Sequence, residues 1–310
     1  MPRFFQSQQP FRFMKFRYFY FALSAIVLIP GLFSFFRVGL RPAVDFTGGS
    51  LMAVRSVTLS EAAPNQAALQ KVVGDAVELV SVQSGGQGVT LIRGREMTNQ
   101  QKDLAVDALK LQYADVVVER FETVGPVLGQ ELIRKALVAI ALVAGAITIY
   151  VWHQFRDLKY GVCAVLAMFH DTFVLIGSFS LLGATRGVEV DVLFVTALLT
   201  TLSFSIHDTI VVYDRIRETL RRHPRATFLE AVDAAVLQTL SRSINNSMTI
   251  IIMLLALALL GGETIRWFVV ALLIGAVTGT YSSTFTAAPL LLLWNDIQER
   301  RKHTSPKIAK

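Results

Sequence analysis

Two neighbouring ionisable residues, His207 and Asp208, interrupt a segment that is otherwise suited to a lipid bilayer. The segment, residues 191–213, is apolar over a length that could cross a membrane. A carboxylate near the middle of such a helix costs about 2.5–3.5 kcal/mol on insertion scales. Thr201 and Ser205 stand seven and three residues before Asp208, on the same helix face. An intramembrane carboxylate on a polar face is a candidate for proton or ion transfer.

A buried carboxylate needs a partner, because an isolated one takes up a proton and becomes neutral. Arg242 is the expected partner of Asp208, since it stands just before the fifth apolar segment and on the same side of the membrane. Protonation of Asp208 would then break the pair and act as a switch. Two alternatives stay open. Arg242 follows the rule that places basic residues on the cytoplasmic side, or Asp208 pairs locally with His207.

A second pair, His170 and Asp171, lies near the middle of the third apolar segment. Both pairs share the local pattern His-Asp-Thr-x-Val, in segments that are expected to form adjacent antiparallel helices. We therefore expect polar groups of neighbouring helices to gather inside the membrane. The alternative is a hydrogen-bonded network that holds the helices together without moving protons.

Catalytic and metal-binding signatures do not occur in the sequence. Metal ligation by the two His-Asp pairs is not expected, because residues at i and i+1 do not share a helix face. The sequence has no glycine-rich phosphate loop, no nucleophile triad and no spacing typical of metal ligands. We expect no metal, no cofactor and no enzymatic activity.

The composition indicates a membrane protein. Of the 310 residues, 53% are hydrophobic and 17% are charged, whereas a soluble domain is about 25% charged. The net charge of +7 would suggest nucleic-acid binding in a soluble protein. Here the basic residues flank apolar segments, as membrane topology demands, so no nucleic-acid partner is expected.

Six segments are long and apolar enough to cross a hydrocarbon core, which takes roughly 20 helical residues. They are residues 17–36, 136–152, 161–182, 191–213, 245–261 and 267–293. The first is expected to be retained rather than cleaved, because no small-x-small cleavage site follows it.

The distribution of Lys and Arg predicts the orientation. Basic residues concentrate in residues 1–16, 153–160, 214–244 and 294–310, which fall on one side if there are six spans. That side is therefore cytoplasmic and holds both termini. The long connection 37–135 has balanced charge and is expected on the outer side.

Two further features are expected in the helical bundle, residues 136–293. The cytoplasmic segment 214–244 includes residues 226–240, which should form an amphipathic helix along the membrane interface. Gly275 and Gly279, followed by Ser283, repeat at four-residue spacing, which allows close helix packing.

The connection 37–135 is expected to fold as one small α+β domain. Strands are predicted at residues 50–57, 76–83, 88–94 and 116–124, and helices at 64–74 and 98–113, the latter with Thr98 as its N-cap. This strand-helix-strand-strand-helix-strand order is typical of a ferredoxin-like unit. The predicted fold is thus an α-helical polytopic membrane protein with six transmembrane helices and one ferredoxin-like α+β domain.

Three separated stretches carry a family resemblance. They are "VDFTGGS" at 44–50, "VGPVLGQEL" at 124–132, and "SIHDTIVVYDRIRE" at 205–218, with Arg242 following. Together they resemble the SecF family of bacterial protein-export membrane proteins, which is part of the SecD/SecF group. In the first stretch, Asp45, Gly48 and Gly49 match the family motif, and the two glycines permit a tight turn into the first strand.

The resemblance implies a non-enzymatic half-transporter of the resistance-nodulation-division superfamily in the bacterial inner membrane. Its implied partners are SecD, the SecYEG channel, the translocating unfolded preprotein, membrane lipid and protons. The implied role is to use the proton-motive force, with SecD, in late translocation and release of preproteins on the periplasmic side. The α+β domain would then be periplasmic.

The family's intramembrane aspartate falls on Asp208 and its arginine on Arg242. The chain departs from the family pattern at His207, where Asn is usual, and at Asn246, where Thr is frequent. Two other functions remain open: half of an efflux pump for a small molecule or lipid, and a structural scaffold of the channel.

Overall fold

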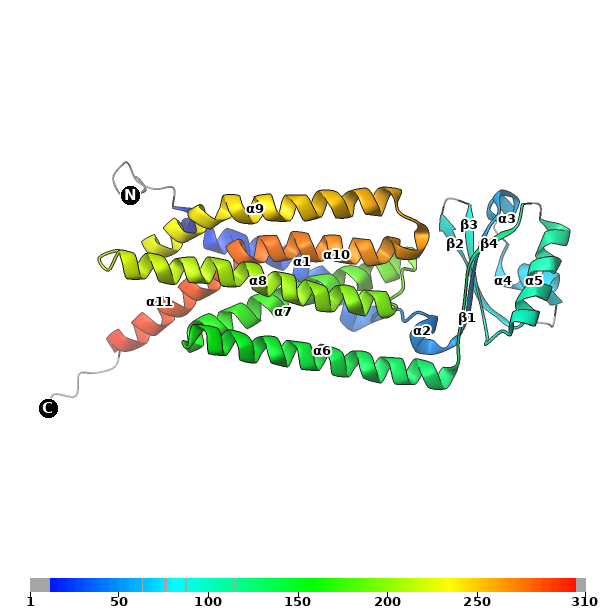
Figure 1. Ribbon diagram of the computed structural model, residues 1–310, viewed down its shortest axis with the longest axis horizontal. Coiled ribbons are helices and arrows are strands. Elements are labelled where there is room, and N and C mark those ends of the chain that lie inside the picture. Colours follow the sequence, from blue (N-terminus) through cyan, green and yellow to red (C-terminus); the bar gives the residue numbers. More distant parts are fainter. Residues whose placement is uncertain (1–11, 63, 75–76, 87, 114, 305–310) are drawn as a thin grey trace. The chain divides into compact units, whose positions relative to one another are not determined.

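The computed structural model describes residues 12–62, 64–74, 77–86, 88–113 and 115–304. Parts of the two predicted terminal segments, and residues 63, 75, 76, 87 and 114 of the predicted α+β domain, lie outside these residues. The chain forms two compact units (Figure 1). One is a helical bundle, and the other contains residues Pro42–Val138 and Val190–Val192.

The bundle is built from long apolar helices, which are α1 (Arg17–Val38), α6 (Pro126–Phe155), α7 (Leu158–Arg186), α8 (Val192–Arg222), α9 (Phe228–Leu260), α10 (Glu263–Ser282) and α11 (Ala288–Thr304). A single-turn 3₁₀-helix, Phe13–Phe16, precedes α1. A π-helical turn, Ser283–Ala287, joins α10 to α11, so the two form one continuous stretch. Six helical stretches among the described residues are long and apolar enough to cross a membrane. The prediction of six spans is confirmed.

The predicted cytoplasmic segment 214–244 belongs to two of the long helices. Helix α8 continues to Arg222, and α9 begins at Phe228, so a short loop joins them. Thr227 and Glu230 form a capping box at the start of α9. No Gly or Pro then interrupts the chain up to Leu260, so the backbone hydrogen bonds continue into the apolar span. The predicted helix at 226–240 thus forms the start of α9 rather than a helix of its own.

The apolar face of this first part of α9 is part of the bundle core. Val232, Ala235 and Val236 are buried in the same cluster as Tyr213 of α8 and Phe155 of α6. The Tyr213 hydroxyl donates a hydrogen bond to the carbonyl of Ala287, 2.8 Å away, at the end of the π-helical turn. Packing within the protein, rather than insertion into the lipid interface, therefore accounts for the amphipathic pattern.

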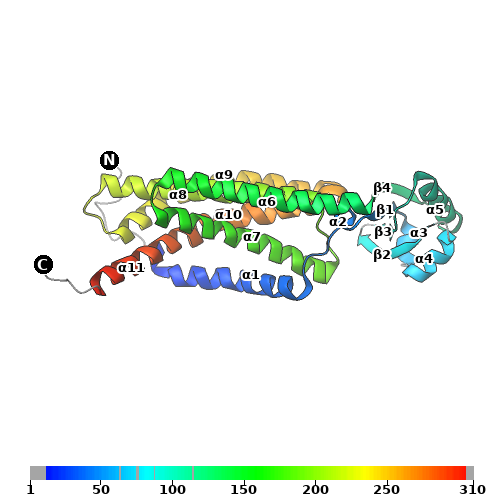
Figure 2. The same cartoon turned by 90° about the horizontal axis from the view of Figure 1, so that it is seen from below.

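Helix α1 lies alongside α7 (Figure 2). Their backbones approach most closely at Gly31 and Gly177: a Cβ built on Gly177 would lie 2.7 Å from the Cα of Gly31. Only glycine at position 177 therefore allows the two helices to approach this closely. One polar link accompanies it, because the hydroxyls of Ser34 and Ser180 are 2.8 Å apart.

The α+β unit has the strand order expected of a ferredoxin-like domain. Its elements are α2 (Val44–Thr47), β1 (Gly49–Arg55), α3 (Val57–Ala62), α4 (Gln66–Val73), β2 (Leu79–Gly86), β3 (Val89–Gly94), α5 (Asn99–Gln112) and β4 (Val117–Val124). The sheet order is β2-β3-β1-β4, and each neighbouring pair is antiparallel. The predicted fold is confirmed. The short helix α3 was not predicted, because residues 56 and 57 were assigned to the first strand.

Side chains from β1 and β3 meet those of the helices in a core of their own, which includes Met52, Leu59, Leu69, Ile92 and Leu109. The predicted N-cap of α5 is confirmed, since Thr98 and Gln101 form a capping box. At the entry to β1, Gly48 and Gly49 have φ values of 74° and 110°. Residues with a Cβ rarely adopt these values, so the turn requires glycine.

Asp115 ties the start of α3 to the loop before β4. Its carboxylate accepts hydrogen bonds from the backbone N–H of Val57, at 3.0 Å, and from the hydroxyls of Ser56 and Thr58. The backbone bond from Val57 has the largest effect on the pKa of Asp115 and lowers it. Desolvation opposes this effect, and the hydroxyl bonds from Thr58 and Ser56 lower the pKa further. Asp115 has a φ of 59°, which Asn also tolerates.

We predict that replacing Gly177 with Val separates α1 from α7 and lowers the thermal denaturation midpoint of the detergent-solubilised chain. Overpacking of this kind costs about 1–3 kcal/mol. Gly145→Val is the matched control, because a Cβ at Gly145 meets nothing within 4 Å. Equal midpoints for the two variants would contradict the predicted close contact.

We predict that Asp115 stabilises its surroundings at neutral pH and that this contribution disappears in acid. Its lowered pKa means that the stabilisation is present above the unfolded value of about 3.9 and is lost as the pH falls through the folded value. In the wild type, peptides covering residues 55–62 should lose protection from hydrogen exchange, corrected for intrinsic rates, as the pH falls below the unfolded pKa of about 3.9. Asp115→Asn should remove the pH dependence, whereas Asp107→Asn, on the exposed face of α5, should retain it. The same acid response in both variants would refute the assignment.

Candidate functional site

Asp208 is held by hydroxyl groups from two other parts of the bundle. Its side chain, on α8, is 7% exposed. Its Oδ2 atom accepts a hydrogen bond from Ser243 of α9. The same oxygen accepts a second bond from Ser283 of the π-helical turn, at 2.9 Å. The carboxylate thereby links α8 to α9 and to the π-helical turn, which are far apart in sequence.

Asp171, on α7, is a second buried carboxylate and is only 1% exposed. Its Oδ2 atom accepts hydrogen bonds from Ser205 of α8, at 2.6 Å, and from Ser282 of α10, at 2.5 Å. Its Oδ1 atom lies 2.9 Å from Nδ1 of His170. The structure therefore brings His170, Asp171 and Ser205 together, as the sequence pattern indicated.

The two carboxylates are linked through consecutive residues of one segment. Ser282, the last residue of α10, contacts Asp171, and Ser283, the first residue of the π-helical turn, contacts Asp208. Helix α8 links them a second time, since Ser205 and Asp208 are three residues apart on one face. π-helical turns are rare and are often found at functional sites.

The predicted ion pair between Asp208 and Arg242 is not present in the described part of the chain. Arg242 is exposed, and the hydroxyl of the next residue, Ser243, bonds to Asp208 instead. Successive residues of an α-helix are rotated by about 100°, so the two side chains cannot face the same point. The sequence placed the correct turn of α9 near Asp208 but named the wrong residue on it.

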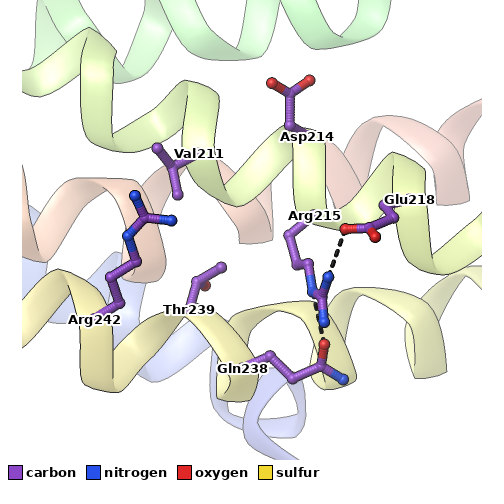
Figure 3. A pocket seen from close by; sticks show the side chains of 7 residues that line it. All are labelled: Val211, Asp214, Arg215, Glu218, Gln238, Thr239 and Arg242. Atoms are coloured by element: carbon purple, nitrogen blue, oxygen red, sulfur yellow. Dashed lines mark hydrogen bonds and ion pairs between the residues drawn. The ribbon is translucent and has the colours of Figure 1, made fainter. Parts of the chain in front are cut away.

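Arg242 instead lines a groove between α8 and α9, with a volume of about 380 Å³ (Figure 3). The other lining residues are Val211, Asp214, Arg215, Glu218, Gln238 and Thr239. Arg215 bonds to both Glu218 and Gln238, whereas the guanidinium of Arg242 points toward Val211 (Figure 3). Val211 and Arg242 lie within one helical turn of Asp208 and Ser243, so the groove begins beside the candidate site.

His207 and Asn246 lie outside this network. Both side chains are exposed, and no hydrogen bond of the His207 ring is found within the described residues. The sequence left open a local pairing of His207 with Asp208. Among the described residues no such pairing is found, although the other neighbouring pair, His170 and Asp171, is in contact.

Thr201, Gly275 and Gly279 contribute to close packing between α8 and α10. The Thr201 hydroxyl donates to the carbonyl of Ala197 in its own helix, at 2.9 Å. A Cβ on Gly275 would lie 2.1 Å from the Thr201 hydroxyl oxygen, and one on Gly279 would lie 3.1 Å from the Phe204 ring. This close approach brings the hydroxyls of α10 within reach of the two carboxylates.

Asp45 has a structural contact of a different kind. Its Oδ2 atom accepts a hydrogen bond from the backbone N–H of Val192, the first residue of α8, at 3.1 Å. A carboxylate at the start of a helix satisfies an otherwise unpaired N–H group and interacts favourably with the helix dipole. Asp45, Gly48 and Gly49 thus shape the entry to the α+β unit.

The sequence did not single out Ser243 or Ser282, and it treated Ser283 as a packing residue. A signal was present, because "TYSSTFT" at 280–286 places five hydroxyl side chains of Ser and Thr in an otherwise apolar span. One more of these, Thr280, bonds to Ser247 of α9 at 2.6 Å. Within the described residues, no group of three or more His, Cys, Asp or Glu is arranged to hold a metal ion.

The arrangement can bind protons. Each carboxylate receives two hydroxyl donors and, in the described residues, no lysine or arginine forms an ion pair with it. A hydroxyl can rotate and either donate or accept, so it can accompany both the ionised and the protonated carboxyl group. An arginine partner would favour only the ionised form.

Comparisons with known proteins agree on one family. The family described as "Protein export membrane protein SecD/SecF, C-terminal" matches residues 105–297. A "Protein translocase subunit SecF" from Thermobaculum terrenum is 39% identical over 312 residues, covering 96% of this chain and 98% of the relative. Another from Anaerolinea thermophila is 40% identical over 285 residues, covering 90% and 92%.

Two solved structures share the fold. The crystal structure of SecDF, a translocon-associated membrane protein from Thermus thermophilus, matches 93% of this chain with a TM-score of 0.80 and 30% identity. SecDF in a "Super-membrane-facing form" matches 96% with a TM-score of 0.69 and 29% identity. The chain spans 39% and 40% of the length of these two structures, respectively.

We predict that the serine donors, and not Arg242, stabilise the bundle around Asp208. Ser243→Ala leaves a buried carboxylate without one donor, which costs about 1–3 kcal/mol. Arg242→Gln should change the free energy of unfolding by less than about 0.5 kcal/mol, as is usual for exposed side chains. Unfolding of the purified chain in mixed micelles measures both. An equal loss of unfolding free energy in the two variants would contradict this prediction and support an ion pair between Asp208 and Arg242.

Proposed function

Because this chain belongs to the SecD/SecF family of protein-export membrane proteins, we propose that it is a proton-coupled accessory subunit of the Sec export machinery. It is a multi-pass membrane protein with six apolar spans. In this proposal it uses the proton-motive force, together with SecD, to assist late translocation and release of unfolded preproteins delivered by the SecYEG channel. It acts by binding and conformational change rather than by catalysing a chemical reaction.

One observation carries the proposal: two carboxylates, Asp171 and Asp208, are buried among apolar helices and are linked through Ser282 and Ser283. Ionisable groups inside a membrane are rare, and they mark functional sites such as ion pathways and proton relays. Moving one charge across 100 mV supplies about 2.3 kcal/mol. This energy can bias two conformations that bind the proton differently.

Protonation of Asp208 would change the contacts among three helices. The ionised carboxylate accepts hydrogen bonds from Ser243 of α9 and Ser283 of the π-helical turn. When a proton binds, the carboxyl group becomes a weaker acceptor and gains a donor of its own. The positions of α9 and the π-helical turn relative to α8 would then be reset.

The proposed orientation follows the positive charges. The short loops after α6 and α8, and the end of α11, are rich in Lys and Arg, which favours the cytoplasmic side for them and for both termini. The α+β domain would then lie in the periplasm of a bacterial inner-membrane protein. Exposed apolar side chains along α1, α6 and α9, such as Phe36, Leu142 and Leu260, suit contact with lipid or with a partner such as SecD.

The likeness to SecDF supports the assignment of SecD as a partner. SecDF structures match this chain over about two fifths of their own length. The remaining part of those chains lies outside the match. We propose that SecD supplies it.

We predict that Asp208→Asn abolishes the gradient-dependent stage of preprotein export while the ATP-driven stage survives. Asparagine keeps the shape of the side chain but cannot bind and release the proton. Export into inverted membrane vesicles, with and without an imposed proton gradient, measures both stages. Glu299→Gln, an exposed carboxylate change on α11, is the matched control.

Membrane levels of the variant and its co-purification with SecD must equal those of the wild type. If both stages of export persist in Asp208→Asn, the polar helices act as a scaffold and proton coupling by Asp208 is refuted. If vesicles containing Asp208→Asn retain export but lose efflux of a small molecule, the chain is half of a pump.

A further inference from the structure

Asp171 is placed more deeply than the proposed coupling group itself. It is 1% exposed, compared with 7% for Asp208, and its neighbours come from α7, α8 and α10. A carboxylate at such a position either receives compensating charge or binds a proton. The role of Asp171 is therefore decided by the charged groups that face it.

The helices around Asp171 carry few charged residues in the parts that pack near it. Helix α1, which packs on α7, has no Asp, Glu, Lys, Arg or His between Arg17 and Arg37. Helix α10 has none after Arg266. Helix α8 contributes Asp208 and the outward-facing His207, and α7 contributes His170 itself. Helix α11, which also packs on α7, has its first charged residue at Asp296, and α10 carries the phenol of Tyr281 beside Ser282. Among the acidic and basic groups of these helices, His170 contacts Asp171 directly and Asp208 is linked to it through Ser282 and Ser283.

His170 completes a site for a proton. Its Nδ1 atom lies 2.9 Å from Oδ1 of Asp171, so a proton between them can rest on either group. Its Nε2 atom is buried and, among the described residues, has no hydrogen-bond partner. A buried polar atom without a partner is costly, so this nitrogen is available to accept a proton or a hydrogen bond.

The two serines that link the carboxylates each have a second acceptor within reach. Ser282 lies 2.5 Å from Asp171 and 3.3 Å from the carbonyl of Gly279. Ser283 lies 2.9 Å from Asp208 and 3.1 Å from the carbonyl of Thr280. Each hydroxyl can therefore donate to a carboxylate or to the preceding helical turn, and its single proton prevents it from donating to both fully.

We propose that Asp171, together with His170, is a second proton-binding site, and that Ser282 and Ser283 couple its protonation to that of Asp208. The inference rests on the proposed proton-coupled function. A proton taken up by one carboxylate releases its serine to bond the helical backbone. The bond reshapes the junction of α10 with the π-helical turn, which moves the adjacent serine relative to the other carboxylate.

The proton balance of each step is simple. One carboxylate and one proton from the aqueous phase give one neutral carboxyl group. The serine hydroxyl keeps its own proton and only changes its acceptor. Uptake at one site therefore alters the proton affinity of the other without a covalent change in the linking residues.

The test follows buried carboxyl groups directly by infrared difference spectroscopy, with the full chain in lipid nanodiscs and the pH as the variable. Protonated carboxyl groups have a C=O band that ionised ones lack. We expect Asp171→Asn to remove one titrating band. Asp208→Asn should lower the pH midpoint of the Asp171 band by about one pH unit or more, the range that defines interacting sites, because a neighbouring negative charge is lost.

Ser282→Ala keeps both carboxylates and tests the link alone. We expect two titrating bands in this variant, and a smaller effect of adding Asp208→Asn on the Asp171 midpoint, because only the through-space effect of the charge then remains. Ser178→Ala is the matched control, because Ser178 donates to the carbonyl of Val174 in its own helix. It should leave both midpoints unchanged.

A wild-type chain without a titrating band from Asp171 would overturn the proposal, and so would an Asp171 midpoint that is the same with and without Asp208. If the Asn variants fail to fold, Asp171→Glu and Asp208→Glu keep a carboxyl group at each site and assign the two bands by the shift that each substitution causes. These spectra need no proton gradient and no preprotein. Loss of gradient-dependent export thus tests the proposed function, whereas the spectra test the second site separately.

Discussion

The bundle depends on one requirement: carboxylates placed among apolar helices must receive hydrogen bonds from the protein. Asp171 and Asp208 meet this requirement with four serine hydroxyls from α8, α9, α10 and the π-helical turn. Each bond fixes the rotation of one helix relative to another, since a shift of one residue would turn a serine away by about 100°. The polar contacts therefore specify the arrangement of helices whose apolar surfaces could pack in several ways.

Close packing makes these short side chains sufficient. Serine has a reach of only one carbon, so the backbones must come near each other. The missing Cβ atoms of Gly275 and Gly279 allow this approach between α10 and α8, and those of Gly31 and Gly177 allow it between α1 and α7. The junction of α10 with the π-helical turn then presents consecutive serines to two different carboxylates. Hydroxyl donors leave each carboxylate able to exchange a proton, which a buried arginine would oppose.

The α+β unit is stabilised by interactions of its own. Its sheet, its core around Leu59 and Ile92, and the carboxylate of Asp115 are all local to residues Pro42–Val138. The unit also includes Val190–Val192, where Asp45 accepts a hydrogen bond from the first N–H group of α8. The helix that carries Asp208 thus begins within the unit that contains the sheet.

Local patterns were enough to predict the six spans, the order of strands and helices, and the N-cap at Thr98. These features depend on runs of apolar residues, on period-two alternation and on side chains within three residues of one another. The sequence also identified Asp171, Asp208 and Ser205 as members of one intramembrane group. The choice between Arg242 and Ser243 was decided by tertiary structure, because the rotation of α9 about its axis is set by packing along its whole length. The continuity of α9 and the π-helical turn have the same origin, since backbone hydrogen bonds and buried contacts with neighbouring helices hold them in place.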